Sequence, residues 1–244
     1  MPWDFWLIFA VLGVILPWRG RSRVKKLLEK QSVETGERLS LYASTIAFQW
    51  FMVALVGWRV LAHRFAAAEL GLAVPRGARV IAAAILGTVA FVGLQWFNLR
   101  RMGRSSRPAS KFLKALGERI FPQTTLELLS YIALALTAGI CEEFLYRGFA
   151  IAAFLRAGLP VWGSILLSAS LFGLAHLYQG RGGFAGTLLL GILFGAARIG
   201  YGSLLPVVAW HAAVDLVAGV AGPRYLKTAA KLEPVVSNLI VVII

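Results

Sequence analysis

Two long stretches without a charged residue constrain the fold of this chain more than any other feature. Residues 39–58 and 80–99 are uncharged over about the 20 residues that a helix needs to cross a bilayer. The whole chain is 59% hydrophobic, with 25 glycines outside that count. A soluble domain has about 45–50% apolar residues with glycine included. We therefore predict an all-α fold, a polytopic transmembrane helix bundle.

The first 38 residues are expected to hold one further span and a surface helix. Residues 3–18 are apolar with tryptophans at both ends, as at a membrane interface, although they include Asp4. The chain start has no basic region and no small-residue cleavage site, so we expect a retained span rather than a signal peptide. The basic residues 19–38 are predicted to form an amphipathic helix on the membrane surface.

The second half contains shorter apolar segments that carry charges. These segments are residues 126–140, 161–177, 184–197 and 203–220. Residues 235–244 are too short to span unless the helix begins near residue 225. The total is about seven or eight spans, with a polar cavity predicted between helices of the C-terminal half.

The chain shows no linker and no internal repeat, so we predict one membrane domain over residues 1–244. Within it, residues 1–120 would supply anchoring spans and basic loops, and residues 121–224 the catalytic core. The net charge of +14 lies mostly in short tracts between apolar stretches, such as residues 19–26 and 100–107. Such tracts orient helices and contact anionic lipids, so membrane lipids are predicted partners and nucleic acid is not. The loop at residues 59–79 is also basic, which leaves the membrane orientation open.

The first polar motif is Glu-Glu-x-x-x-Arg at residues 142–147. Neighbouring residues on a helix point about 100° apart, so the two glutamates cannot do the same work. Glu143 and Arg147 are four residues apart and share a face, which predicts an ion pair. Glu142 is then free to meet another helix. The alternative interpretation is a solvated helix end at the membrane interface.

Two further motifs add imidazole groups and a carboxylate. His176 ends an apolar helix in Phe-x-x-x-His, and His211 precedes Asp215 by four residues, on one helix face. Separately, each has a structural explanation: a packed histidine, or a His–Asp hydrogen bond. Charged groups are expensive to bury in a membrane and usually mark function. The polar side chains on three such helices can pair with one another, which predicts a shared site with a base, a histidine pair and an orienting carboxylate.

These motifs, in this order on consecutive membrane helices, resemble those of the CPBP family. That family comprises CAAX prenyl proteases and bacteriocin-processing and self-immunity proteins. The motifs cover residues 142–215, and nothing before about residue 120 resembles the family. The resemblance implies intramembrane peptide hydrolysis, with a peptide or lipidated protein as substrate, prenylated or bacteriocin-like. It also implies an integral protein of a bacterial or archaeal cytoplasmic membrane.

The resemblance further implies roles for the site residues. Glu142 with His176 would activate water, His211 and the residue at position 215 would stabilise the oxyanion, and Glu143 with Arg147 would support the site. The prenyl proteases carry asparagine where this chain has Asp215. An ionised aspartate cannot donate a hydrogen bond, so we expect Asp215 to orient His211 and keep it protonated.

The sequence leaves metal dependence open. Glu142, His176 and His211 match the ligand types of a zinc site with two histidines and one carboxylate, so a divalent metal such as zinc is one alternative. The spacing is not His-Glu-x-x-His, and a metal-free glutamate mechanism needs the same residues. The single cysteine, Cys141, allows no intrachain disulfide and no zinc–thiolate cluster.

Other functions and nucleophiles have weaker support. Cys141 is expected to be a small buried thiol, and Ser164 lacks the following glycine of a rhomboid-like serine site. A non-catalytic immunity or scaffold protein is the main alternative to a glutamate-dependent endopeptidase. A proton-coupled transporter is a third, although no inverted repeat or broken helix pair is apparent.

Overall fold

The computed structural model describes residues 1–105 and 108–227, and every regular element in these ranges is helical. Elements η1 and η2 are π-helical, and η3 is a 3-10 turn. The elements, in chain order, are α1 Trp3–Ala10, η1 Val11–Ile15, α2 Leu16–Glu29, α3 Thr35–Ala62, α4 Gly77–Arg104, α5 Pro108–Ile120, α6 Thr125–Glu142, η2 Glu143–Ala150, α7 Ile151–Arg156, α8 Val161–Ala175, η3 Leu177–Gln179, α9 Gly180–Tyr201 and α10 Leu205–Lys227. The all-α prediction is confirmed.

Six helical stretches of the described chain are long and apolar enough to cross a membrane. A seventh helix, α8, is apolar but has only 15 residues. Two of these stretches, Trp3–Glu29 and Thr125–Arg156, include a π-helical segment. The polytopic bundle is therefore confirmed, with six spans and one shorter helix where the sequence predicted seven or eight spans. The tail at residues 235–244, expected to span only if its helix begins near residue 225, lies outside the described residues.

The surface helix predicted over residues 19–38 does not form as a separate element. Helix α2 continues the first span without a break to Glu29, and a new helix begins at Thr35. Two basic residues of α2, Arg19 and Arg23, lie on a face that lines a cavity, described below. The start of α3 is fixed by a reciprocal capping interaction between Glu34 and Glu37.

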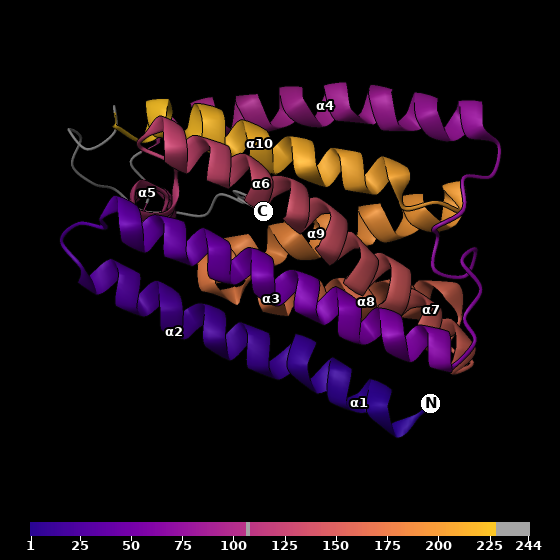
Figure 1. Cartoon of the computed structure of the whole chain (residues 1–244). Helices are drawn as coiled ribbons and strands as arrows, with labels where there is room; N and C mark the ends of the chain where they lie inside the picture. Colours follow the sequence, from indigo (N-terminus) through magenta and orange to yellow (C-terminus); the bar gives the residue numbers. More distant parts are fainter. Residues whose placement is uncertain (106–107, 228–244) are drawn as a thin grey trace.

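The helices pack in a row that Figure 1 shows from α4 at the top, through α10 and α6, to α3. Helix α8 packs on α9, and α2 packs on α5, α8 and η3. The contact between α6 and α10 is close because Gly139 faces Ala212: a Cβ atom at Gly139 would lie 2.9 Å from the Ala212 Cβ. Small residues permit such approach in membrane bundles. This contact places residue 143 beside residue 211.

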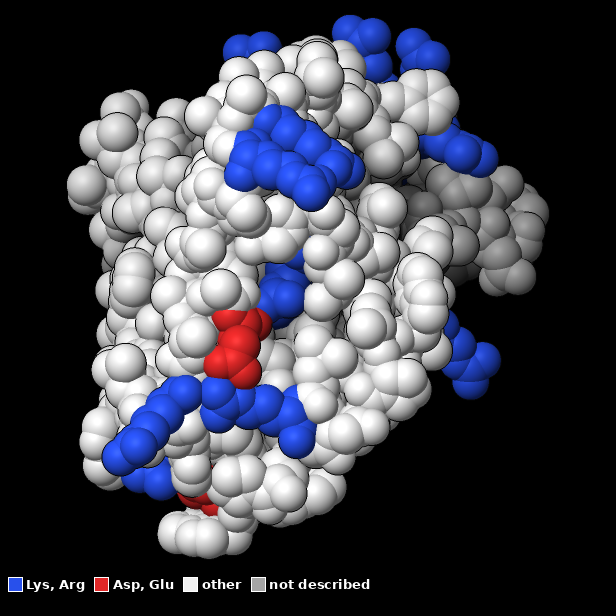
Figure 2. Space-filling model, turned by 90° about the vertical axis from the view of Figure 1, so that its right-hand side faces the viewer, with Lys and Arg blue, Asp and Glu red and all other residues white. Residues whose placement is uncertain are grey.

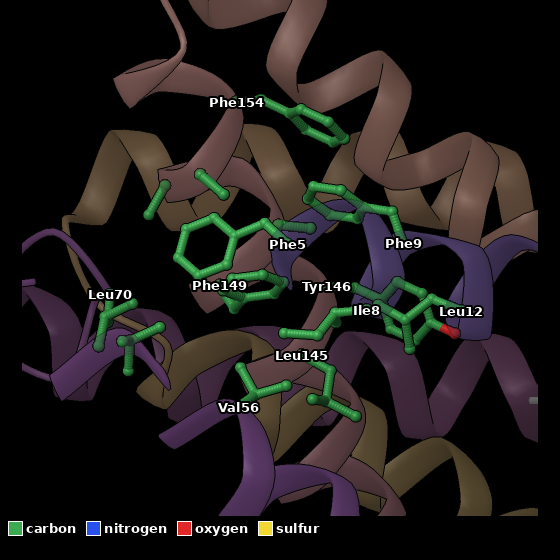
Figure 3. Close-up of a cluster of buried hydrophobic side chains, with 14 of the residues drawn as sticks. Phe5, Ile8, Phe9, Leu12, Val56, Leu70, Leu145, Tyr146, Phe149 and Phe154 are labelled. Atoms are coloured by element: carbon green, nitrogen blue, oxygen red, sulfur yellow. The ribbon is translucent and has the colours of Figure 1, made fainter. Parts of the chain in front are cut away.

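Aromatic packing holds η2 and α7 against the first helix (Figure 3). The rings of Phe5 and Phe149 meet edge to face, with centroids 5.0 Å apart, and those of Phe9 and Phe154 stack at 4.6 Å. Phe149 is fully buried. The π-helical segment Glu143–Ala150 is therefore fixed by the packing of Phe149 on the first helix.

The end of the molecule that holds the N-terminus carries few charged side chains on a largely uncharged surface (Figure 2). One of its ion pairs joins Arg156 to Glu69, with two nitrogen–oxygen distances of 2.7 Å. This hydrogen bonding holds the pKa of the Glu69 carboxyl below its usual value. The backbone carbonyl of Glu69 also accepts a hydrogen bond from Arg198. The loop between α3 and α4 is thereby tied to α7 and α9.

Candidate functional site

The paired glutamates lie at the junction between α6 and η2. Glu142 is the last residue of α6, and Glu143 is the first of the π-helical segment that extends to Ala150. A π-helical turn is rare and often lies at a functional site. Glu143 is fully buried, whereas Glu142 is partly exposed. The two carboxylates therefore have different environments, as the sequence predicted.

Glu143 is the centre of a buried charge network. Its Oε1 atom accepts a hydrogen bond from the Arg147 guanidinium at 2.8 Å, so the predicted ion pair is confirmed. The same oxygen lies 2.7 Å from Nδ1 of His211 on α10. A carboxylate only accepts, so Nδ1 of His211 carries the proton and donates it. The Arg147 guanidinium also lies over the Phe172 ring, 4.0 Å from its centroid.

Glu142 faces the opposite way, toward α3. Its Oε1 atom accepts a hydrogen bond from the side-chain amide of Gln49 at 2.7 Å. Glu142 and His176 line a cavity of about 270 Å³ and also a neighbouring one of about 150 Å³. The sequence predicted a cavity in the C-terminal half, but residues of α2 and α3 form much of the wall of the larger one. The two groups expected to handle water therefore share one hollow.

His176 follows the last residue of α8, and its tautomer is fixed by the backbone. Nδ1 lies 2.8 Å from the carbonyl oxygen of Phe172, one helical turn earlier. A carbonyl only accepts, so Nδ1 donates, and Nε2 of a neutral ring presents a lone pair. Because His176 lines both cavities, it brings a hydrogen-bond acceptor to them.

Asp215 lies at the smaller cavity, but it is not the main partner of His211. Its Oδ2 atom is 3.8 Å from Nε2 of His211, beyond hydrogen-bonding distance. His211 donates the hydrogen bond that orients its ring to Glu143, which takes the role that the sequence gave to Asp215. His211 itself is fully buried and lines neither cavity. The structure thus brings all six predicted residues together, in two layers: Glu142, His176 and Asp215 at the cavities, and Glu143, Arg147 and His211 behind them.

Several buried polar atoms of this cluster have no hydrogen-bond partner among the described residues. They are Glu142 Oε2, Glu143 Oε2, Arg147 Nε and Nη2, His211 Nε2 and Asp215 Oδ1. Buried polar groups in folded proteins are nearly always satisfied by protein, water or a ligand. Such a concentration of unsatisfied donors and acceptors is suited to binding water and a polar substrate group.

The candidate zinc ligands do not form a metal site in this arrangement. Within residues 1–105 and 108–227, no group of three or more His, Cys, Asp or Glu side chains could hold a metal ion. The hydrogen bonds of the three candidates use Oε1 of Glu142 and the Nδ1 atoms of His176 and His211. As arranged here, the three side chains do not converge as a metal site, and we derive no step through a metal ion.

Some residues near the site were not predicted. The two alternative nucleophiles, Cys141 and Ser164, line neither of the two cavities. Gln49 lies in a long uncharged stretch, where one amide gives no recognisable signal, and Tyr178 lines both cavities although no motif marks it. Cys141 is buried as a free thiol. The Ser164 hydroxyl donates to the carbonyl of Pro160 within its own helix turn, at 3.2 Å.

Fold and site together define a class: an integral membrane protein with a buried glutamate–histidine cluster at the meeting of several helices. Residues 124–217 match the model of the family described as type II CAAX prenyl endopeptidase Rce1-like. This match confirms the resemblance, and it covers every residue of the charged cluster. No curated protein and no solved structure shows a significant match to the chain. The family supports a CAAX-type intramembrane endopeptidase.

Proposed function

We propose that the protein hydrolyses a peptide bond of a membrane-associated substrate, using water activated by Glu142 and His176. The substrate class would be a prenylated protein or a bacteriocin-like peptide, in the cytoplasmic membrane of a bacterium or archaeon. The observation that carries the proposal is the placement of a carboxylate and a tautomer-fixed imidazole on one cavity. Both are groups that accept a proton from water.

In this scheme water enters the cavity and donates hydrogen bonds to Glu142 and to Nε2 of His176. Glu142 removes one proton as the water oxygen attacks the carbonyl carbon. A tetrahedral oxyanion forms. The same proton then passes from Glu142 to the amide nitrogen, and the carbon–nitrogen bond breaks to give a carboxylic acid and an amine. The acid's remaining proton, the second one of the water, passes to the amine, so a carboxylate and an ammonium group leave. No further reactant is needed.

His211 is the donor that we assign to the oxyanion. Because its side chain is buried behind the cavities in this structure, a bound substrate has to displace the side chains that cover its Nε2. Its Nδ1 proton is held by Glu143, and Nε2 has no partner among the described residues. When both ring nitrogens carry a proton, Nε2–H can donate a hydrogen bond to the oxyanion. Glu143 and Arg147 are positioning residues in this scheme, since they act through His211. A preorganised donor of this kind contributes about 10²- to 10³-fold in rate.

The test is cleavage of candidate membrane-associated peptides by purified protein, comparing wild type with Glu142→Gln. The variant should lose about 10²- to 10⁴-fold in rate, which is the usual contribution of a general base. Wild type should keep its activity in a chelator. Full activity of Glu142→Gln would refute the role of Glu142, and loss of activity in chelator, restored by zinc, would replace the metal-free scheme with a metallo-endopeptidase.

The alternative is a non-catalytic immunity or scaffold protein. It needs no water-accessible carboxylate, whereas Glu142 lines two cavities. It predicts that Glu142→Gln, His176→Ala and His211→Ala all retain the cellular phenotype of wild type. The peptidase predicts that all three lose it while the proteins remain folded.

A further inference from the structure

The side chain of Gln49 on α3 has one end at the proposed base and its other end without a partner. Its Nε2 atom donates a hydrogen bond to Oε1 of Glu142 at 2.7 Å. A carboxylate only accepts, so this contact fixes which end of the amide faces Glu142. The amide oxygen, Oε1 of Gln49, is buried and has no hydrogen-bond partner among the described residues. A buried acceptor of this kind needs a donor from water or from a ligand.

The unpartnered oxygen belongs to the hollow in which we place the hydrolysis. Gln49 lines both the larger and the smaller cavity, as do Glu142 and His176. The nitrogen and oxygen of an amide are about 2.3 Å apart, so Oε1 of Gln49 lies within about 5 Å of the Glu142 carboxylate. The walls that the two cavities share also hold apolar side chains, Ile120 and Leu134. A hydrogen bond made in such surroundings is stronger than one made in water.

The water of the proposed reaction does not supply the missing donor. Water has two protons, and the proposed scheme uses both of them, one toward Glu142 and one toward Nε2 of His176. The amide oxygen of Gln49 is a third acceptor in the same hollow. A peptide that enters brings a backbone N–H group at every residue except proline. Because an N–H group that is buried without a partner is costly, the two unpaired groups complement each other.

We propose that Gln49 accepts a hydrogen bond from a backbone N–H group of the substrate while its own N–H group holds Glu142 in place. The inference rests on the proposed function and adds a substrate-binding residue from outside the family match at residues 124–217. Successive residues of an extended peptide are about 3.3–3.6 Å apart, so the bound N–H group lies within two residues of the cleaved bond. The contact does not depend on the side chains of the substrate.

The experiment replaces one backbone N–H group of a cleaved peptide at a time by an ester oxygen, which removes the donor and keeps the shape. The cleaved amide itself is left unchanged. Cleavage in phosphatidylcholine vesicles gives kcat and KM for wild type, Gln49→Met and Gln49→Glu. Methionine removes both hydrogen-bonding groups at similar length, whereas an ionised glutamate keeps an acceptor and loses the donor to Glu142.

The matched control is Thr45→Val, one helical turn before Gln49 on the same helix. Thr45 also lines both cavities, but its hydroxyl already donates to the Leu41 carbonyl at 2.7 Å. Thr45→Val should therefore behave as wild type toward every peptide. Melting temperatures show whether each variant is folded.

In wild type, one ester within two residues of the cleaved bond should lower kcat/KM by about 5- to 100-fold, as expected when a buried acceptor is left unpaired. Gln49→Met should cleave the all-amide peptide about 5- to 100-fold more slowly, and that one ester should cause it no further loss. The other esters should affect both proteins equally. Gln49→Glu should stay sensitive to the same ester, but with a lower kcat, because two neighbouring carboxylates repel each other.

A wild type that tolerates an ester at every position within two residues of the cleaved bond would overturn the inference, and this comparison needs no variant. Full ester sensitivity in Gln49→Met would overturn it as well, because the N–H group would then bind elsewhere, and so would an equal loss in Thr45→Val. If Glu142→Gln is inactive in those cases, only this inference fails. If wild type cleaves no peptide, or Glu142→Gln cleaves as well as wild type, the proposed function fails and the inference falls with it.

Discussion

The pairing of Glu143 with the buried Arg147 guanidinium and the His211 ring predicts that Glu143→Gln destabilises the protein as well as inactivating it. Both partners donate to one oxygen, at 2.8 and 2.7 Å, and the side chains of Glu143 and Arg147 are 0% exposed. Glutamine keeps the shape but removes the charge, which leaves Arg147 uncompensated. Breaking a buried pair costs about 3–5 kcal/mol. For a domain of this size, that lowers the melting temperature by about 6–20 °C.

Glu142→Gln provides the contrast, because it should inactivate the protein without unfolding it. The glutamine oxygen can still accept the hydrogen bond from Gln49, so the stability cost should stay near 1 kcal/mol. Thermal unfolding in detergent, followed by tryptophan fluorescence, and peptide cleavage in vesicles measure the two effects separately. A Glu143→Gln protein that melts within about 2 °C of wild type would refute the reasoning, because an uncompensated buried charge should lower the unfolding free energy by more than that shift corresponds to.

A double variant controls for unspecific damage at this site. Glu143→Gln/Arg147→Met removes both charges of the pair, so no unpaired ion remains. It should melt above Glu143→Gln alone and show a coupling free energy of about 0.5–3 kcal/mol. It should nevertheless stay inactive, since His211 has lost the carboxylate that orients it. If the double variant lost as much unfolding free energy as the Glu143→Gln and Arg147→Met single variants combined, the pairing would be contradicted.

Two further substitutions test the geometry. Gly139→Val should lower the unfolding free energy by about 1–3 kcal/mol and remove most of the activity, because a side chain there meets Ala212 and separates α6 from α10. The control is Gly57→Val, which has no atom within 4 Å of its Cβ position and should change the unfolding free energy by no more than about 0.5 kcal/mol. Asp215→Asn should reduce kcat/KM by less than about tenfold, since His211 keeps its hydrogen bond to Glu143. A loss in Asp215→Asn as large as that in Glu143→Gln would show that Asp215 orients the ring after all.

Local spacing predicted one half of the charge network and missed the other. The Glu143–Arg147 pair joins residues four apart in one helix, so it could be predicted from the sequence. The same rule pairs His211 with Asp215, yet the ring is hydrogen-bonded to Glu143, 68 positions away in the chain. The reason is the close contact between Gly139 and Ala212, which only the packed helices reveal. Tertiary packing decides which of two nearby carboxylates the imidazole binds.

The fold was predictable where composition determines it and less so where helices join. Long uncharged stretches predicted the spans formed by α3 and α4, because lipid requires a helix there. The same rule separated residues 19–38 from the first span on account of their charge, although α2 continues that span. Charges in α2 are compatible with a continuous helix because the face with Arg19 and Arg23 borders a cavity instead of lipid. A hydropathy pattern cannot distinguish these two surroundings.

The division into an anchoring half and a catalytic half describes where the charged motifs lie, but not what encloses the site. Residues 124–217, which match the endopeptidase family, contain every member of the charged cluster. The hydrogen-bond partner of Glu142 on α3, and the arginines of α2, come from outside that range. Because the groups that would contact a substrate away from the cleaved bond lie in these first helices, the family match constrains the chemistry more tightly than the substrate. Under the proposed function, substrate choice would depend on the cavity wall that α2 and α3 build, and substitutions in that wall would test it.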